Sequence, residues 1–185
     1  GIDRDNERYV TIALGAPSKG VSPLQMAAAY VPFVHKGMYF EPTTYTKVYD
    51  SKGNLLLEKK PQYYPVYNET TAFLMVSMMK DVINARGGTA YPGGIIKNGE
   101  EKVIPTAGKT GTNNEFKGVY FAGFTPYYTA TVWIGHDDFQ PSFVSGSTGG
   151  TFAAPLWKSF MEPIHSQLES VDFYEKVPDD VVRFT

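Results

Sequence analysis

The sequence predicts an α+β fold in which an antiparallel sheet is flanked by helices. Helix-like spacing of apolar residues dominates before residue 103, three short strand-like runs follow up to residue 135, and another helical segment comes after them. Consecutive strands separated by short turns pair most economically as antiparallel neighbours. With 185 residues, 42% apolar and 19% charged, the chain is too apolar for disorder and long enough to bury a substantial core.

The first helix is expected to begin after Ser22. Ser22 suits the N-cap position, a proline follows it at the first helical position, and Gln25 can close a capping box onto the Ser22 backbone. The helix should run toward Gly37. Because proline lacks a backbone donor, Pro32 is expected to kink this helix or end it early.

A hairpin and a second helix follow. Strand-like runs within residues 43–57 are joined by turn residues that include Asp50 and Gly53, which predicts a peripheral hairpin. Asn68 can cap the second helix, which should end near Gly87. Apolar residues at three- and four-residue spacing give this helix a core-facing stripe, made of Ala72, Met75, Val76, Met79, Val82 and Ile83.

From Val103 onward the pattern is typical of strands. We predict three strands here: a run that begins at Ala107 and the runs 119–124 and 128–135. Apolar and polar residues alternate in the last run, as is typical of a strand. The three are most economically adjacent and antiparallel. A further helix should begin around residues 153–155, after a loop rich in glycine and serine. Its predicted apolar face consists of Leu156, Trp157, Phe160 and Met161.

The last part of the chain differs in composition from the rest. Residues 169–185 form an acidic tail that is expected to be loosely held, whereas residues 1–168 are expected to belong to one domain.

The most informative stretch is Lys109-Thr110-Gly111-Thr112, which contains a K-T-G element. This pattern suits a site where N–H groups at a strand edge stabilise an oxyanion while a cation and hydroxyls hold a carboxylate. A phosphate-binding loop that ends in Gly-Lys-Thr is disfavoured. Val103 stands where that loop needs its first glycine, and residues 118–124 are strand-like rather than helical.

A second motif that often accompanies K-T-G is S-x-x-K, and Ser77 with Lys80 has this spacing. A nucleophilic serine should stand at a helix N-terminus, where backbone N–H groups favour developing negative charge. Ser77 lies several turns inside its predicted helix, so we reject it as the nucleophile.

Five segments with conspicuous residue patterns occur in the order known from one family. They are residues 20–30, 107–114, 121–126, 132–135 and 149–157. Together they resemble the transpeptidase domain of penicillin-binding proteins, over roughly residues 8 to 165. In sequence, these segments are most similar to those of class A, the bifunctional enzymes that also carry a peptidoglycan glycosyltransferase domain.

The resemblance implies a β-lactamase/transpeptidase-like fold, with an antiparallel sheet of five strands and helices on both faces. It also implies a serine-type D,D-transpeptidase that needs no cofactor. In that reaction a serine attacks the D-Ala-D-Ala bond of a peptidoglycan stem peptide, D-Ala leaves, and an amine of another stem takes the acyl group. β-Lactam antibiotics would acylate the same serine.

The resemblance assigns roles on the K-T-G strand. Lys109 would supply positive charge beside the cleft, and the hydroxyls of Thr110 and Thr112 would hold the substrate carboxylate. The Thr112 backbone N–H would be an oxyanion donor, and Gly111 would allow close backbone approach to the ligand. Asn113, Asn114 and Tyr120 are candidates for lining the cleft, although turn formation and sheet packing explain them equally well.

The chain departs from the family pattern because S-x-N occurs nowhere in it. We therefore expect the chain to be the C-terminal part of the domain, with the nucleophile and S-x-N motif upstream in a missing N-terminal half. The isolated chain is expected to be inactive. An anchor outside the chain would hold the parent protein at the extracytoplasmic face of a bacterial membrane, since the sequence contains no run apolar enough to span a bilayer.

Two other functions compete with transpeptidation. A D-Ala-D-Ala carboxypeptidase or serine β-lactamase shares the K-T-G chemistry but transfers the acyl group to water. A non-catalytic module that binds β-lactams or stem peptides would keep the carboxylate site without turnover. The segments around residues 20–30 and 153–157 favour the transpeptidase.

Composition and spacing argue against other classes of partner. The net charge of −2 and the lack of a Lys/Arg cluster argue against nucleic-acid binding, and the absence of cysteine excludes thiol chemistry and disulfides. His136-Asp137-Asp138 does not have the spacing of a known metal site, because adjacent residues at a strand end cannot all face one ion. No metal is therefore expected.

Overall fold

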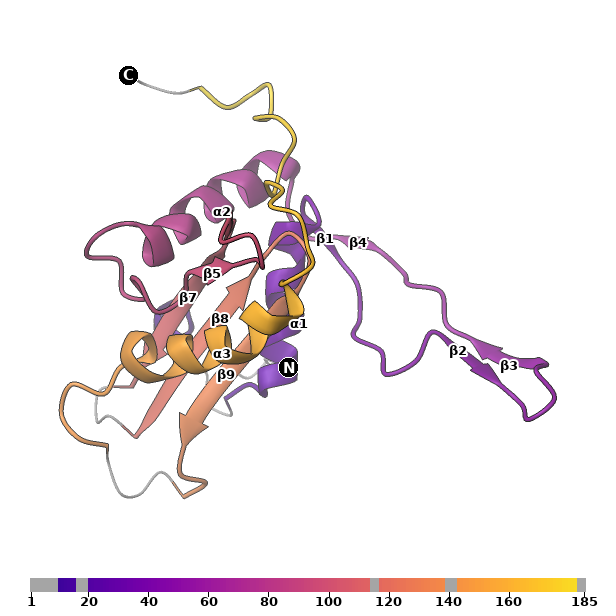
Figure 1. Cartoon of the computed structure of the whole chain (residues 1–185), viewed down its shortest axis with the longest axis horizontal. Helices are drawn as coiled ribbons and strands as arrows, with labels where there is room; N and C mark the ends of the chain where they lie inside the picture. The colour runs from indigo at the N-terminus through magenta and orange to yellow at the C-terminus, as the bar shows by residue number, and fades with distance from the viewer. Residues whose placement is uncertain (1–9, 16–19, 114–116, 139–142, 183–185) are drawn as a thin grey trace.

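The computed structural model describes residues 10–15, 20–113, 117–138 and 143–182. Its centre is an antiparallel sheet in the order β7-β8-β9, made of β7 (Ala107–Thr112), β8 (Gly118–Phe124) and β9 (Thr129–Gly135). These are the three adjacent strands that the sequence predicts. The fold class is thus confirmed as α+β, with helices on both faces of this sheet (Figure 1).

The helix α1 (Pro23–Val34) packs against β8 and β9 on one face. Its capping box is present as expected, because the Ser22 backbone N–H donates to Gln25 Oε1 at 3.0 Å and the Gln25 N–H donates to Ser22 Oγ at 3.2 Å. Pro32 lies inside the helix, which ends only two residues later. The helix therefore stops short of Gly37, as the early break at proline predicted.

The helix α2 (Glu69–Asn84) begins after the predicted cap, since the Thr71 N–H donates to Asn68 Oδ1 at 2.7 Å. It runs beside β7 and also contacts α1. Four residues of the predicted stripe are buried and two are half-buried, so this face is confirmed as core-facing. The helix ends before Gly87, three residues earlier than the glycine signal suggested.

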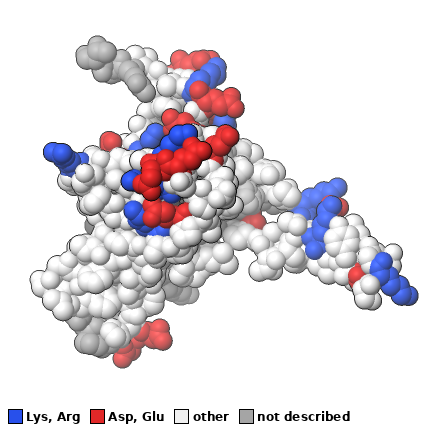
Figure 2. Space-filling view, in the orientation of Figure 1, with Lys and Arg blue, Asp and Glu red and all other residues white. Residues whose placement is uncertain are grey.

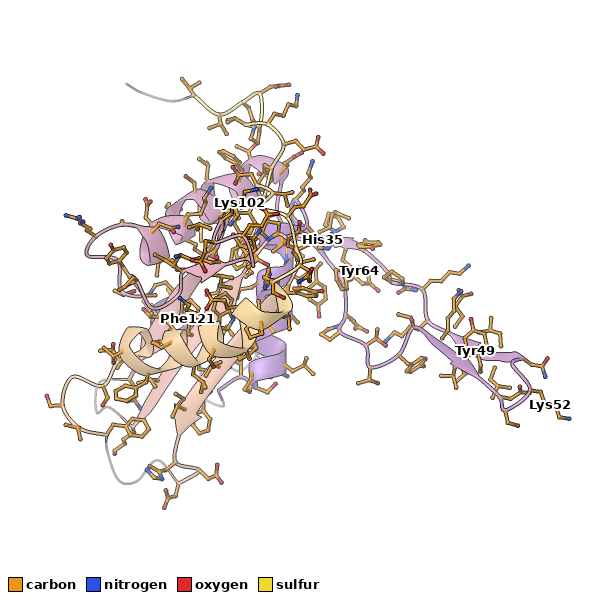
Figure 3. The ribbon with its side chains drawn as sticks, in the orientation of Figure 1. His35, Tyr49, Lys52, Tyr64, Lys102 and Phe121 are labelled. Carbon is orange, nitrogen blue, oxygen red and sulfur yellow. The ribbon has the colours of Figure 1, made fainter. Side chains whose placement is uncertain are left out.

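The opposite face of the sheet is covered by α3 (Ala154–Ile164) and by η2 (Gly149–Ala153), a π-helical turn that leads into it. In Figure 1, α3 lies in front of the sheet and α1 behind it. Trp157 is fully buried here, its Nε1 donates to the Ala130 carbonyl at 3.1 Å, and its ring meets that of Phe121 edge-on. Figure 3 labels Phe121 between α3 and the sheet.

The predicted apolar face of α3 is only half right. Trp157 and Met161 are buried, whereas Leu156 and Phe160 are 49% and 43% exposed. Successive helical residues differ in direction by about 100°, so two apolar stripes lie side by side on this helix. The sheet covers the stripe that contains Trp157 and leaves the neighbouring stripe open.

The expectation of a loosely held tail is wrong for residues 172–174. Phe173 is buried against Phe124 on the α1 face, with ring centroids 5.3 Å apart. The Tyr174 hydroxyl donates to the Phe33 carbonyl at 3.0 Å, and Asp172 pairs with Lys80 at 3.1 Å. The side chains of these residues therefore dock this acidic segment onto α1 and α2. Its boundary at residue 168 stays a prediction.

A long arm projects from the body (Figure 1). At its base β1 (Met38–Tyr39) pairs with β4 (Tyr64–Pro65), and at its tip β2 (Lys47–Tyr49) pairs with β3 (Leu55–Glu58), which confirms the peripheral hairpin. Figure 2 shows lysine side chains at two separate places along this arm, with acidic side chains beside them. Within the body, β5 (Ile96–Lys97) pairs with β6 (Val103–Ile104), so the strand pattern at 103 belongs to this separate ribbon.

Candidate active site

The K-T-G strand emerges from the core as it approaches the site. Ala107 and Gly108 are buried, whereas Lys109 and Thr112 are exposed. Gly108 is packed so tightly that an added Cβ would lie 2.6 Å from the Ala122 carbonyl oxygen. Within the described residues β7 is an edge strand, paired only with β8. One side of its backbone is thus left facing a ligand site.

The register of the ladder fixes which N–H groups face that open edge. The Asn113 N–H donates to the Gly118 carbonyl at 3.3 Å, and Gly111 lies opposite Tyr120. In an antiparallel pair, hydrogen-bonded positions alternate with positions whose backbone groups point away from the partner strand. The N–H groups of Thr110 and Thr112 therefore point toward the outer edge.

The ammonium group of Lys109 lies at the same edge, where it donates to the Thr110 carbonyl at 2.9 Å. Among the described residues no carboxylate pairs with Lys109. A cavity of about 660 Å³ opens beside it, between the sheet and the segment that leads into α1, and Gly111, Met26 and Trp133 contribute to its lining. This cavity thus has an uncompensated positive charge at its rim.

Two segments from elsewhere in the chain hold the hydroxyls of the K-T-G strand. Thr110 Oγ1 lies 2.7 Å from Thr89 Oγ1, which comes from the segment that follows α2. Thr112 Oγ1 accepts a hydrogen bond of 3.1 Å from the Gly149 N–H at the start of η2. Since a hydroxyl has one proton and two lone pairs, Thr112 keeps its proton for a ligand.

Glycine is required where η2 crosses the site strand. A Cβ added to Gly149 would overlap the Tyr120 carbonyl oxygen and lie 2.9 Å from the Gly111 carbonyl oxygen. A Cβ on Gly111 would lie 3.1 Å from Tyr120 Cβ. The close approach of these backbones fixes where η2 sits over the strand.

The remaining predicted cleft residues have partly structural roles. Asn113 lines the cavity, but its Oδ1 accepts the Lys117 N–H at 2.7 Å and so closes the turn between β7 and β8. Tyr120 also lines the cavity; burial raises the pKa of its hydroxyl, which makes no well-formed hydrogen bond among the described residues. Asn114 lies outside the described residues.

The motifs that the sequence argument rejected lie apart from this site. Ser77 is in the middle of α2 beside a separate cavity of about 290 Å³, and its motif partner Lys80 pairs with Asp172. His136, Asp137 and Asp138 are exposed after β9, and no metal-binding group of three such side chains occurs in the part of the chain that the structure describes. None of its described helices is long and apolar enough to cross a bilayer.

Sequence reasoning missed Thr89 and Gly149. Both act through contacts with residues 21 and 37 positions away, which no local pattern encodes. The paired glycines before Thr89 and at 149–150 are the available signal, since paired glycines often mark close backbone contacts.

The assembled edge has a definite chemical capacity. Outward N–H groups can stabilise a negative oxygen, and an adjacent cation with two hydroxyls can hold a carboxylate a few ångströms away. Among the described residues that line the cavity beside these groups there is no serine or cysteine. The edge is thus suited to binding and polarising an acyl compound that carries a carboxylate.

Comparison with known proteins gives matches to one family. The family model "Penicillin binding protein transpeptidase domain" matches residues 3–162. Penicillin-binding protein 1A of Clostridium botulinum (strain Langeland) is 38% identical over 164 residues, which are 89% of this chain and 19% of the relative. The protein of that name from Aquifex aeolicus is 31% identical over 174 residues, 94% of this chain and 22% of the relative. The chain spans about a fifth of the length of these relatives.

Solved structures show the same fold. The crystal structure of penicillin-binding protein 1A from Haemophilus influenzae superposes with a TM-score of 0.78 at 24% identity, covering 93% of this chain and 30% of that chain. The PonA1 protein from Mycobacterium tuberculosis in complex with penicillin V gives a TM-score of 0.74 at 20% identity, covering 97% of this chain and 50% of that chain.

Proposed function

The chain belongs to the family of penicillin-binding protein transpeptidase domains, and from this premise we propose that it supplies the K-T-G half of a serine-type D,D-transpeptidase site. The parent enzyme cross-links peptidoglycan stem peptides that end in D-Ala-D-Ala and is acylated by β-lactams. The observation that carries the proposal is the outer edge of β7, where the Thr112 N–H, two threonine hydroxyls and the Lys109 ammonium meet.

These groups have separate tasks in the acylation step. The serine Oγ attacks the carbonyl carbon of the D-Ala-D-Ala peptide bond, and the carbonyl oxygen becomes an oxyanion that accepts the Thr112 N–H. Losing one such donor costs on the order of 3 to 4 kcal/mol of transition-state stabilisation. The hydroxyls of Thr110 and Thr112, with Lys109 beside them, hold the terminal carboxylate of the peptide.

The bond to the terminal D-Ala then breaks, and D-Ala leaves with a proton on its new amine. An amine from a second stem peptide attacks the acyl-serine ester, which releases the serine and forms the cross-link. The serine and its base are absent from this chain and are assigned to sequence upstream of Gly1. The chain alone is accordingly inactive, and its parent acts at the extracytoplasmic face of the membrane.

The test uses the natural full-length protein, with any sequence encoded upstream of Gly1, treated with benzylpenicillin and analysed by intact mass and peptide mapping. We expect one adduct, on a serine upstream of Gly1. Lys109→Ala should slow acylation about 12- to 160-fold, the equivalent of a charge-assisted hydrogen bond of about 1.5 to 3 kcal/mol. Lys52→Ala at the tip of the arm is the matched control (Figure 3).

Several outcomes would overturn the proposal. A folded protein that binds penicillin without an adduct would be a binding module, and an adduct on Ser77 would show that the motif assignment is wrong. If the protein forms the adduct but passes the acyl group of a stem peptide to water and never to an amine, it is a carboxypeptidase or β-lactamase.

A further inference from the structure

A pair of threonine hydroxyls links the site strand to the segment after α2. Thr89 Oγ1 and Thr110 Oγ1 are 2.7 Å apart, a typical distance for a hydrogen bond between hydroxyls. We propose that Thr89 is a positioning residue: its hydroxyl donates to Thr110 Oγ1 and thereby directs the Thr110 proton at the carboxylate of the stem peptide or β-lactam. The inference rests on the proposed function and deepens it.

The direction of this hydrogen bond follows from counting protons. Either hydroxyl can be the donor in the unliganded pair. A carboxylate can only accept hydrogen bonds, so Thr110 must donate its single hydroxyl proton to the ligand once a carboxylate is bound. The Thr110 oxygen is then free to accept, and Thr89 is the side chain that can donate to it. A hydroxyl that accepts one hydrogen bond also becomes a better donor for the next.

Thr112 shows the same arrangement with a different donor. Its hydroxyl accepts from the Gly149 N–H, a group that can never accept in return, so the Thr112 proton always remains available. For Thr110 the equivalent donor is a side chain. Of these two donors, the Thr89 hydroxyl and the Gly149 N–H, only the hydroxyl can be removed by a side-chain substitution that leaves the backbone unchanged.

The backbone around Thr89 is held firmly enough to position a hydroxyl. The Ala90 N–H donates to the Val82 carbonyl at 2.9 Å, and Ala90 is buried. On the other side the Thr89 carbonyl lies against Gly150, where an added Cβ would overlap it. This segment thus bridges the end of α2 and η2, and its contacts fix the position of the Thr89 backbone relative to the site strand.

A merely structural role for Thr89 makes a different prediction. If the hydroxyl only ties the segment to the strand, its loss should affect stability and all ligands alike. If it directs the Thr110 proton, its loss should matter only for ligands with a free carboxylate, and it should not add to the loss of the Thr110 hydroxyl.

The experiment compares wild type, Thr89→Val, Thr89→Ser and Thr110→Val in the natural full-length protein. Binding and acylation constants are measured separately for benzylpenicillin and for its methyl ester, whose carboxylate is blocked. Thr70→Val is the matched control, because the Thr70 hydroxyl donates to Asp180 at 2.6 Å near the start of α2, away from the site strand. Thermal unfolding is recorded for every variant.

We expect Thr89→Val to lower acylation efficiency with benzylpenicillin about 2- to 12-fold, the range of one hydrogen bond of about 0.5 to 1.5 kcal/mol. The ester should react equally fast with wild type and Thr89→Val, and Thr89→Ser should restore acylation by the free acid. Adding Thr89→Val to Thr110→Val should cause no further loss, because the two hydroxyls act as one unit.

Equal acylation of wild type and Thr89→Val by benzylpenicillin would overturn this inference while leaving the proposed function intact. An equal loss for the acid and the ester would also overturn it, in favour of the structural role. Absence of acylation in wild type and in Thr70→Val would overturn the proposed function and this inference together.

Discussion

Replacing Gly149 by alanine should damage the site without altering any residue that touches a ligand. The added Cβ would overlap the Tyr120 carbonyl oxygen and approach the Gly111 carbonyl oxygen to 2.9 Å, and both are backbone atoms that cannot rotate away. The turn η2 must therefore lift off the strand. The Gly149–Thr112 hydrogen bond, now 3.1 Å, needs to lengthen by only about 0.5 Å to be lost.

The resulting loss of orientation at Thr112 sets the expected magnitude. A misplacement of about 1 Å in a catalytic group can cost on the order of 100-fold in rate, so Gly149→Ala should slow acylation about 10- to 100-fold. The assay is the second-order rate of acylation of the full-length protein by a fluorescent penicillin. Gly94→Ala is the control, because the atoms nearest to its Cβ would be those of the Ile83 side chain, at 3.3 to 3.5 Å. Acylation of Gly149→Ala at the wild-type rate would refute the reasoning.

Two further predictions concern stability. Trp157→Ala should lower the free energy of unfolding by about 3 to 5 kcal/mol in denaturant titrations, because a fully buried ring and its hydrogen bond are lost, whereas Phe160→Ala on the exposed stripe should cost far less; equal losses would contradict the observed orientation of α3. Burial, with a smaller contribution from Glu69, raises the pKa of the Tyr174 hydroxyl to about 12, from a usual value of 10. Since the folded-state pKa is the higher one, the contribution of Tyr174 to stability is complete below pH 10 and is lost as the pH rises toward 12. An ultraviolet titration should show a tyrosine that ionises near pH 12 and disappears in Tyr174→Phe; an unchanged titration in that variant would contradict the docking of the tail.

Much of the fold could be predicted because its signals are local. The caps at Ser22 and Asn68 are short-range hydrogen bonds, and the structure forms both. The three strands of the sheet are consecutive in the chain, so their pairing needs no long-range information. The site strand could be recognised for a similar reason, since the K-T-G residues that act together are adjacent in sequence.

What could not be predicted depends on contacts between distant segments. The exposed positions of Leu156 and Phe160 depend on which side of α3 the sheet covers, and helical spacing alone cannot decide between neighbouring apolar stripes. The docking of Phe173 requires a hollow formed by residues about 50 to 140 positions earlier. The role of Thr89 likewise could not be predicted, because it depends on a contact with Thr110, which is distant in the sequence.

The register of β7 has a consequence for how this protein can vary over evolution. The proposed oxyanion donor at position 112 is a backbone N–H. Backbone groups along β7 point alternately toward β8 and toward the outer edge, so the position of residue 112 in this alternation decides the direction of its N–H. Substitution of the side chain leaves that donor in place, and proline alone removes it. Insertion of a single residue into the strand would turn it inward. Substitutions around the donor can thus change the hydroxyls and the charge, while the length of the strand stays constrained.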